Sequence, residues 1–154
     1  MKIAALFHNV RSTHNVGSLL RTSDGAGVPK VYLTGYTPTP VDRFGRPQKD
    51  IAKTALGAER FISWEYAKHP SSIIRRLRAE GWEIIGVEQD ARAVDYRGFT
   101  PKLPTLFVFG NEVRGLSLAL RDQCDALIEI PMHGKKESLN VSVAAGVILF
   151  RFNN

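Results

Sequence analysis

The sequence predicts an α/β protein, with a mainly parallel β-sheet that is covered by helices on both faces. Short apolar runs alternate along the chain with segments that carry apolar residues at helical spacing, as in strands joined by helical crossovers. The apolar runs are almost uninterrupted, which is typical of strands buried on both faces. A chain of 154 residues can bury a real core, and it contains no linker, repeat or low-complexity segment. We therefore expect residues 1–154 to form a single domain.

The first half of the chain contains five expected elements. Asn15 is a favourable N-cap for the first helix, and Gly27 is a favourable stop after it. Three prolines and Gly45 between residues 36 and 49 predict a loop, after which Asp50 can cap a short helix. The expected elements, in order, are strand 3–7, helix 15–26, strand 31–34, a helix from 50 to about 57 and strand 61–63.

The second half begins with the clearest helix of the sequence, residues 71–80. Ile73, Ile74 and Leu77 form one apolar face of this helix, and Gly81 ends it. Residues 91–104 lack a regular pattern and are expected to be irregular and exposed. The remaining expected elements are strand 83–87, strand 105–109, a short helix 117–122, strand 127–130 and a final helix 138–150.

The final helix is apolar on nearly every side. Val143 and Val147 are among the apolar residues that surround it, and a helix that is apolar all round is buried all round. One domain of this size has little room to hide such a helix, so we expect one of its faces to meet a second subunit in a homodimer. The alternative is a helix buried entirely in the core of a monomer.

Charge and cysteine content narrow the function classes. The formal net charge is +6 and the isoelectric point is about 9.7, which favours nucleic acid or another polyanion as partner. The single cysteine, Cys124, excludes an intramolecular disulfide and a cysteine-based zinc cluster, and the histidines have no metal-ligand spacing. No apolar run is long enough to span a bilayer, and residues 1–7 are too short for a signal peptide. We expect a cytoplasmic protein without a metal or membrane partner.

Three strand ends predict where a ligand binds, because parallel sheets bind ligands outside the carboxyl ends of their strands. These ends are Val87–Glu88, Phe109–Gly110 and Ile130–Met132, and Gly110 allows a close backbone approach. Ser138 and Asn140 lie where the last helix is expected to begin, at unpaired N–H groups. The chain has neither a G-x-G-x-x-G nor a Walker A pattern, which argues against a dinucleotide enzyme or a P-loop ATPase.

Four segments, taken together, resemble the SpoU–TrmH group of RNA ribose methyltransferases, which belongs to the SPOUT superfamily. They are residues 9–22, 53–59, 109–117 and 130–144, in family order and spacing across nearly the whole chain. The resemblance implies an α/β-knot fold with a C-terminal trefoil knot. It also implies transfer of a methyl group from S-adenosylmethionine to a ribose 2′-hydroxyl of tRNA or rRNA. The alternative is a non-catalytic RNA-binding protein that retains the methyltransferase fold.

The resemblance also implies which residues form the site. Arg21 would contact the RNA and orient the hydroxyl, because an arginine stays protonated and does not act as a free base. Glu112 would hold the guanidinium of Arg21 as a bidentate partner; the alternative is a surface Arg21 paired with Asp24 or Glu112. Asn15, Ser138 and Asn140 would complete the catalytic site, although both asparagines could instead satisfy helix-start backbone groups. The positions that match the cofactor-binding residues of the family are Val87, Gly110, Ile130, Met132, Ser138 and Leu139.

Several basic side chains and one aromatic ring are expected to contact RNA. Phe44 can stack on a base while its flanking cations meet phosphates, and the alternative is a solvated charged loop. We expect no additional N-terminal RNA-binding domain of the kind found in many relatives, so that the catalytic dimer itself recognises RNA or the protein acts on a compact element such as a tRNA stem-loop. The candidate RNA-binding residues are Arg11, His14, Arg43, Phe44, Arg46, Lys135 and Lys136.

Overall fold

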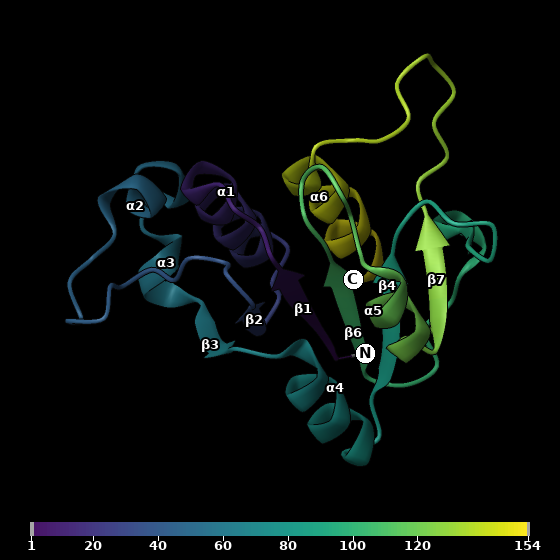
Figure 1. Cartoon of the computed structure of the whole chain (residues 1–154), viewed down its shortest axis with the longest axis horizontal. Coiled ribbons are helices and arrows are strands. Elements are labelled where there is room, and N and C mark those ends of the chain that lie inside the picture. Colours follow the sequence, from purple (N-terminus) through teal and green to yellow (C-terminus); the bar gives the residue numbers. More distant parts are fainter. Residues whose placement is uncertain (1, 154) are drawn as a thin grey trace.

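The protein is described by a computed structural model in which residues 2–153 are placed, so Met1 and Asn154 of the predicted domain lie outside the described residues. Strands and helices alternate along the chain (Figure 1). The strands are β1 Ile3–His8, β2 Lys30–Thr34, β3 Ser63–Ala67, β4 Glu83–Val87, β5 Val94–Asp95, β6 Thr105–Phe109 and β7 Ala126–Glu129. The helices are α1 Thr13–Gly25, α2 Lys49–Ala55, α3 Ala58–Phe61, α4 Pro70–Ala79, α5 Leu118–Gln123 and α6 Val141–Phe152, with a 3-10 turn at Tyr96–Gly98.

The seven strands form one parallel sheet in the order β3-β2-β1-β6-β4-β7-β5, as the apolar runs predicted. The first strand lies inside the sheet, where Ile3 is in register with Thr105 of β6. From β1 the chain builds outward through β2 and β3, and then crosses to the other side of the sheet. Neighbouring strands β1 and β6 therefore continue into connections that diverge, which is where parallel sheets open a crevice for ligands.

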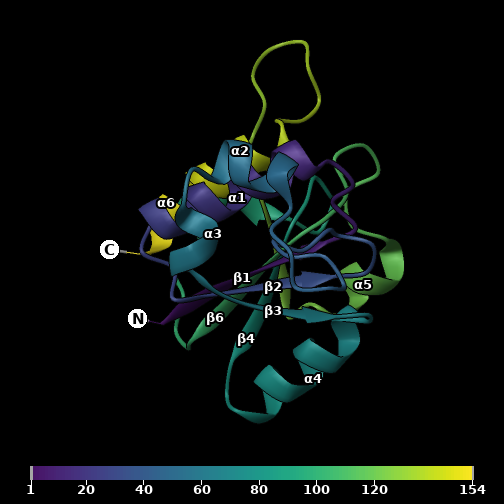
Figure 2. The ribbon, with the colours of Figure 1, turned by 90° about the vertical axis from the view of Figure 1, so that its left-hand side faces the viewer.

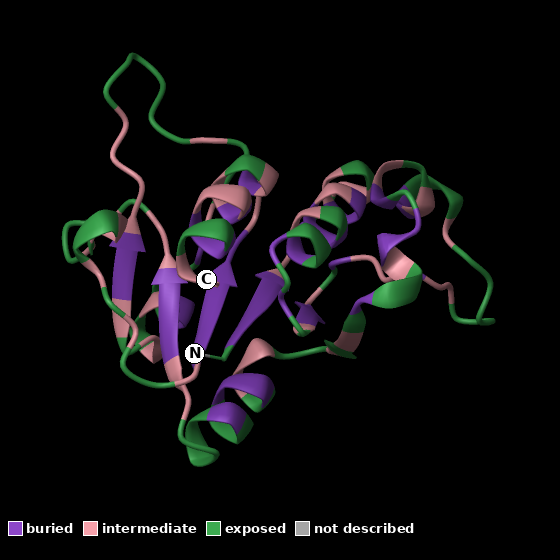
Figure 3. Ribbon diagram, turned by 180° about the vertical axis from the view of Figure 1, so that it is seen from behind, coloured by how far each residue is buried: buried purple, intermediate pink, exposed green. Residues whose placement is uncertain are grey.

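Helices cover both faces of the sheet, as expected (Figure 2). Helices α1, α2 and α6 pack on one face around Phe7 and Phe107, and α4 and α5 pack on the other around Leu6 and Val108. Successive strand residues supply opposite faces, and the strands of the centre are buried along their length (Figure 3). Gly17 lets α2 approach α1 closely, because a Cβ atom there would lie 2.4 Å from the carbonyl oxygen of Ile51.

Three element boundaries in the first half differ from the prediction. The N-cap of α1 is Ser12, whose hydroxyl accepts a hydrogen bond from the Asn15 N–H at 3.1 Å, so Asn15 lies inside the helix. Helix α2 begins at Lys49, and Asp50 is in its first turn instead of capping it. The strand expected at 61–63 is shifted to Ser63–Ala67, because residues 58–61 form a helical turn.

Two boundaries in the second half also differ. Residues 91–104 are mostly irregular, but they contain β5 and the 3-10 turn. Helix α6 begins at Val141 and not at Ser138, since Asn140 is the N-cap and its side-chain oxygen accepts the Ser142 N–H at 2.8 Å. Helix α6 buries one side against the rest of the chain, while Val143 and Phe150 are 52% and 55% exposed. The chain therefore covers only part of the apolar surface of the helix.

None of the helices formed by residues 2–153 is long and apolar enough to cross a membrane.

Candidate functional site

A pocket of about 260 Å³ opens at the carboxyl edge of the sheet, where β4, β6 and β7 end beside the start of α6; we call it the edge pocket. Its walls combine apolar side chains, such as Phe109 and Ala144, with four carboxylates. The carboxylates are Glu88, Glu112, Glu129 and Glu137. Five of the six predicted cofactor-binding residues line the pocket: Val87, Gly110, Ile130, Ser138 and Leu139. Met132 is half-buried and is not among the lining residues.

Gly110 is required by the backbone around the pocket. A Cβ atom there would lie 2.4 Å from the carbonyl carbon of Gly115 and 2.7 Å from the Leu116 nitrogen. Residues 111–115 fold back on themselves, with Asn111 and Gly115 exchanging N–H to carbonyl hydrogen bonds of 3.2 and 2.9 Å. The glycine was predicted to leave space for a ligand, but the space it leaves is filled by this turn. A larger residue at this position would displace the wall of the edge pocket.

Glu112 connects the turn to the segment after β1. Its two carboxylate oxygens accept the backbone N–H groups of Arg11 at 3.0 Å and Ser12 at 2.9 Å, and the Asn15 side-chain amide donates at 3.3 Å. Burial raises the pKa of the Glu112 carboxyl group, but these hydrogen bonds outweigh burial and the pKa lies below its usual value. The carboxylate is therefore ionised and fixed in place, and it joins residues about one hundred positions apart.

Arg21 does not join this arrangement within the protomer. The predicted bidentate pair with Glu112 is not formed, because backbone N–H groups and Asn15 occupy the carboxylate. Arg21 is exposed in the third turn of α1, roughly 12 Å along the helix axis from Thr13 at 1.5 Å per residue. Across residues 2–153 it forms no ion pair with Asp24 or Glu112 and no hydrogen bond. Asn15 and Glu112 are brought together, whereas Arg21 is left free on the surface.

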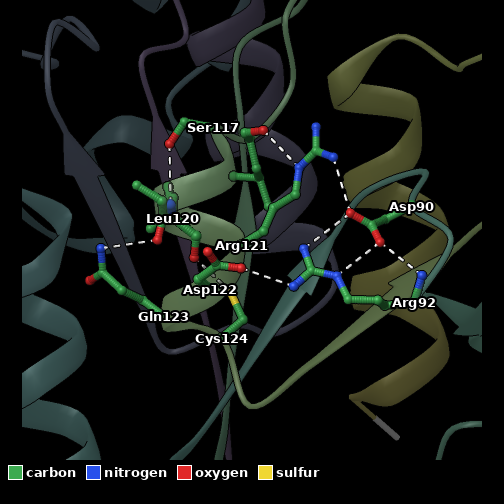
Figure 4. Close-up of polar contacts among 10 residues, drawn as sticks. Asp90, Arg92, Ser117, Leu120, Arg121, Asp122, Gln123 and Cys124 are labelled. Carbon is green, nitrogen blue, oxygen red and sulfur yellow. Dashed lines mark hydrogen bonds and ion pairs between the residues drawn. The ribbon is translucent and has the colours of Figure 1, made fainter.

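Residues that the sequence reasoning missed support the opposite wall. The Glu88 carboxylate accepts the Leu116 N–H at 2.7 Å, so the end of β4 holds the turn after β6. Two residues further on, Asp90 accepts hydrogen bonds from Arg92 and from Arg121 of α5, as Figure 4 shows. These arginine contacts hold the pKa of the Asp90 carboxyl group well below its usual value. The position of Glu88 directly after a buried strand could have predicted its role, whereas no sequence pattern indicates the contacts of Asp90.

The segment between β7 and α6 carries the other predicted residues. It projects from the body of the molecule in Figures 1 and 3, and Lys135, Lys136 and Ser138 are exposed on it. Asn140 is exposed, caps α6, and also accepts the Ser142 hydroxyl at 2.6 Å. It performs the structural role that was the alternative to a role in the site, and it does not line the edge pocket.

The predicted RNA-binding residues before β3 lie at a second depression on the same edge. Arg43, Phe44 and Arg46 line it, and both guanidinium groups lie over the Phe44 ring, at 4.8 and 5.0 Å from its centroid. Arg11 lies over the ring of Tyr36 at 5.4 Å, and His14 is exposed at the start of α1. Arg43 and Arg46 therefore lie together at this second depression, whereas Lys135 and Lys136 lie on the segment between β7 and α6.

Cys124 is half-buried at the end of α5, where burial and the neighbouring Asp125 raise the pKa of its thiol to about 12. Within residues 2–153 no group of three or more His, Cys, Asp or Glu side chains is arranged to hold a metal ion.

The fold and site define an α/β protein with a pocket at the carboxyl edge of a parallel sheet. The chain belongs to the SpoU rRNA Methylase family, whose model matches residues 2–150. This confirms the family predicted from the four sequence segments.

Similar proteins share this domain as part of longer chains. The chain is 37% identical over 145 residues to 23S rRNA (guanosine-2′-O-)-methyltransferase RlmB of Ralstonia nicotianae, covering 92% of this chain and 54% of that protein. It is 32% identical over 142 residues to tRNA (guanosine(18)-2′-O)-methyltransferase of Aquifex aeolicus, covering 92% of this chain and 64% of that one. Among solved structures, the AdoMet-bound rRNA methyltransferase from Sinorhizobium meliloti matches with a TM-score of 0.87 and 30% identity, covering 97% of this chain and 54% of that chain.

Proposed function

We propose that this chain transfers a methyl group from S-adenosylmethionine to a ribose 2′-hydroxyl of tRNA or rRNA. The observation that carries the proposal is the edge pocket, which combines apolar walls and four carboxylates at the strand ends of a SpoU-family fold. Relatives named as 2′-O-methyltransferases act on 23S rRNA and on tRNA. The chain spans about half to two thirds of the length of these relatives, so the activity of the whole protein is part of the proposal.

The residues of the edge pocket fit S-adenosylmethionine. Its flat adenine ring suits apolar walls such as Val87, Ile130 and Leu139, and its positive charges suit the surrounding carboxylates. The volume of about 260 Å³ is close to the lower end of the range for small-molecule sites, roughly 300 Å³. We propose that Val87, Gly110, Ile130, Ser138 and Leu139 hold the cofactor. Met132 has no support from the pocket geometry.

The cofactor supplies a methyl group that is already activated on a sulfonium, so the protein has to supply alignment. Alignment of two reactants contributes on the order of 7–11 kcal/mol in favourable cases. Arg21 would bind an RNA phosphate and orient the hydroxyl, since it stays protonated and cannot take the proton itself. Glu112 would act through the backbone, because it fixes the Arg11–Asn15 segment against the edge pocket. A phosphate oxygen or water would accept the proton.

We propose that the active form is a homodimer in which Arg21 serves the edge pocket of the partner protomer. Helix α6 contributes Val141 and Ala144 to the edge pocket, and Val143 and Phe150 of the same helix are exposed. Helix α1 packs against α6, so a partner seated on the exposed apolar side of α6 would bring a second α1 close to the pocket. This arrangement would explain why Arg21 is exposed and unpaired in one protomer.

Three further expectations belong to the same proposal. Residues 1–154 would form one methyltransferase domain, and its C-terminal part would be threaded as the trefoil knot that the family resemblance implies. Helix α6 returns from β7, near one edge of the sheet, to pack beside α1, which is a path compatible with threading. The substrates named for the relatives, tRNA and rRNA, would place its work in the cytoplasm.

The dimer is tested by changing Val143→Glu on the exposed side of α6. Because Val143 is 52% exposed, the protomer should fold normally while the interface gains buried charges, and light scattering should show monomers without methyl transfer. Leu103→Glu, at a residue 49% exposed in a loop before β6, is the matched control and should stay dimeric. A wild-type protein that is monomeric at micromolar concentration would contradict the dimer.

The activity is tested by mapping ribose methylation in total RNA from cells with and without the protein. The proposal expects one or a few 2′-O-methyl positions that disappear with the protein and are restored by purified protein with S-adenosylmethionine. Calorimetry should show cofactor binding without added metal. RNA binding without cofactor binding, and without any lost methylation, would support the non-catalytic alternative.

A further inference from the structure

The second depression on the carboxyl edge is an open groove whose walls are aromatic, and we call it the aromatic groove. It lies where β2 and β3 end, and its rings are Tyr36, Phe44, Trp64 and Tyr66. Phe44, Tyr36 and Tyr66 are 66%, 51% and 45% exposed, whereas Trp64 is half-buried and packs against the core. Exposed aromatic side chains gathered in one groove mark a surface that binds something flat and partly apolar.

The rim of the groove is cationic and held in shape. Asp42 accepts the N–H groups of Phe44 at 2.8 Å and Arg46 at 3.0 Å, and its second oxygen accepts the Arg46 Nε–H at 2.8 Å. These contacts fix the loop that presents the Phe44 ring with the guanidinium groups of Arg43 and Arg46 against it. A surface that is ordered before binding loses little conformational freedom when a ligand arrives.

Tyr36 connects the aromatic groove to the edge pocket. Its hydroxyl accepts a hydrogen bond at 3.0 Å from the side-chain amide of Asn111, which lines the edge pocket, and its N–H donates to the Asn9 side chain at 3.0 Å. The Arg11 guanidinium lies over the Tyr36 ring, while the Arg11 N–H is bound to Glu112. A hydrogen bond therefore joins a residue that lines one site to a residue that lines the other, so the two sites are neighbours on the edge of the sheet.

The chemistry of the groove selects unpaired RNA over other occupants. Guanidinium groups match phosphates, and a base can stack on an aromatic ring or on the plane of a guanidinium group such as those that lie over Phe44 and Tyr36. In an A-form duplex the bases are stacked inside the helix and these rings cannot reach them. A free nucleotide would match the rings and cations but would not use the neighbouring edge pocket.

We propose that the aromatic groove is a further RNA site, which binds an unpaired base next to the nucleotide methylated in the edge pocket. This rests on the proposed function and adds to it a site for a neighbouring base. The 2′-hydroxyl that receives the methyl group would then belong to a nucleotide whose neighbour is held by Tyr36, Phe44 or Tyr66.

The test compares a labelled single-stranded RNA of about 12 nucleotides, within the span of known single-strand sites, with the same strand annealed to its complement. Fluorescence anisotropy should show tighter binding of the single strand by the wild type. Phe44→Leu and Tyr66→Leu should each weaken single-strand binding by about 5- to 150-fold, the equivalent of losing one stacked base. Phe61→Leu is the matched control, because Phe61 is 79% exposed but lies outside both sites, and its binding should equal that of the wild type.

Calorimetry with S-adenosylmethionine separates this proposal from the proposed function. Cofactor affinity should be unchanged in Phe44→Leu and Tyr66→Leu. If the wild type binds cofactor and methylates RNA while both variants bind single strands as the wild type does, the groove proposal is overturned and the methyltransferase stands. Preference for the duplex, or a loss of cofactor affinity in the groove variants, also overturns the groove proposal. A wild type that binds neither cofactor nor RNA overturns both.

Discussion

The edge pocket and the aromatic groove share one edge of the sheet but differ in charge. The edge pocket gathers four glutamates at the ends of β4, β6 and β7 and on the segment before α6, with Arg114 as its only basic lining residue in the described chain. The aromatic groove gathers Arg43 and Arg46 at the end of β2, with Asp42 as its only acidic lining residue there. The proposed sulfonium cofactor would be attracted to the first and repelled by the second, and the reverse would hold for phosphates. If both proposals hold, the contrast in charge helps to direct the two ligands of the reaction to adjacent sites.

The largest expected effect comes from a residue that belongs to neither site in its own protomer. Arg21→Ala should abolish methyl transfer while S-adenosylmethionine affinity stays within twofold, because Arg21 is exposed and does not line the edge pocket. Turnover of purified protein and calorimetry measure the two quantities. Arg75→Ala, at an exposed residue of α4 on the other face of the sheet, is the control and should keep full activity. Normal turnover by the Arg21→Ala variant would contradict the proposal that Arg21 binds the RNA and orients the hydroxyl.

A larger side chain in the edge pocket should weaken cofactor binding and leave RNA binding unchanged. Ala144→Phe adds a ring at the wall that α6 contributes, and cofactor affinity should fall by about tenfold or more, or roughly 1.4 kcal/mol. Single-strand RNA affinity should stay within twofold, since Ala144 is not part of the aromatic groove. Ala119→Phe, at an exposed alanine of α5, is the control. This substitution is a better probe than Gly110→Val, which would displace the turn at residues 111–115.

Removing the arginines of the aromatic groove should weaken RNA binding. Arg43→Ala combined with Arg46→Ala should lower RNA affinity and flatten its dependence on the logarithm of salt concentration by about one to two units. Filter binding across a salt series gives the slope. Arg75→Ala with Arg78→Ala removes the same charge from α4 and should leave the slope unchanged. Equal slopes for the wild type and the double variant would show that the loop with Arg43 and Arg46 is a solvated connection that does not contact RNA.

The smallest expected effect comes from Glu112, whose hydrogen bonds join the turn after β6 to the segment after β1. Glu112→Gln should lower the melting temperature by a few degrees at neutral pH, because the ionised carboxylate accepts four hydrogen bonds, from the Arg11 and Ser12 N–H groups and from the side-chain amides of Asn15 and Asn111. The folded pKa of Glu112 is depressed below its usual 4.5, so its contribution is complete above that pH and is lost as pH falls through the folded pKa. Melting curves from pH 3 to 7 should therefore converge for the two proteins at the acidic end. A constant difference across this range would contradict the assignment.

Sequence reasoning predicted the central strands β1, β4 and β6 well, because they are nearly uninterrupted apolar runs. It shifted β3, which is half polar, and it missed the two-residue strand β5. It misplaced helix starts where two polar residues competed for the cap, as with Ser12 against Asn15 and Asn140 against Ser138. It placed Val87, Gly110 and Ile130 at the edge pocket because the ends of parallel strands converge at one edge, whereas Glu112, Ser138 and Leu139 came from the family resemblance. It could not predict that Glu112 binds backbone N–H groups instead of Arg21, since that choice depends on how residues about one hundred positions apart meet.

The position of β1 in the sheet affects how the chain can fold while it is being synthesised. Strand β1 is inside the sheet, and its neighbour β6 begins at Thr105, so half of its hydrogen-bond partners are made about one hundred residues later. At typical rates of synthesis this interval is roughly 5–20 s. During that time the edge of β1 that faces β6 is an apolar template open to wrong pairing. We expect nascent chains that end before Thr105 to need chaperones, and release of residues 105–109 from the ribosome to be the step that commits the chain to its fold.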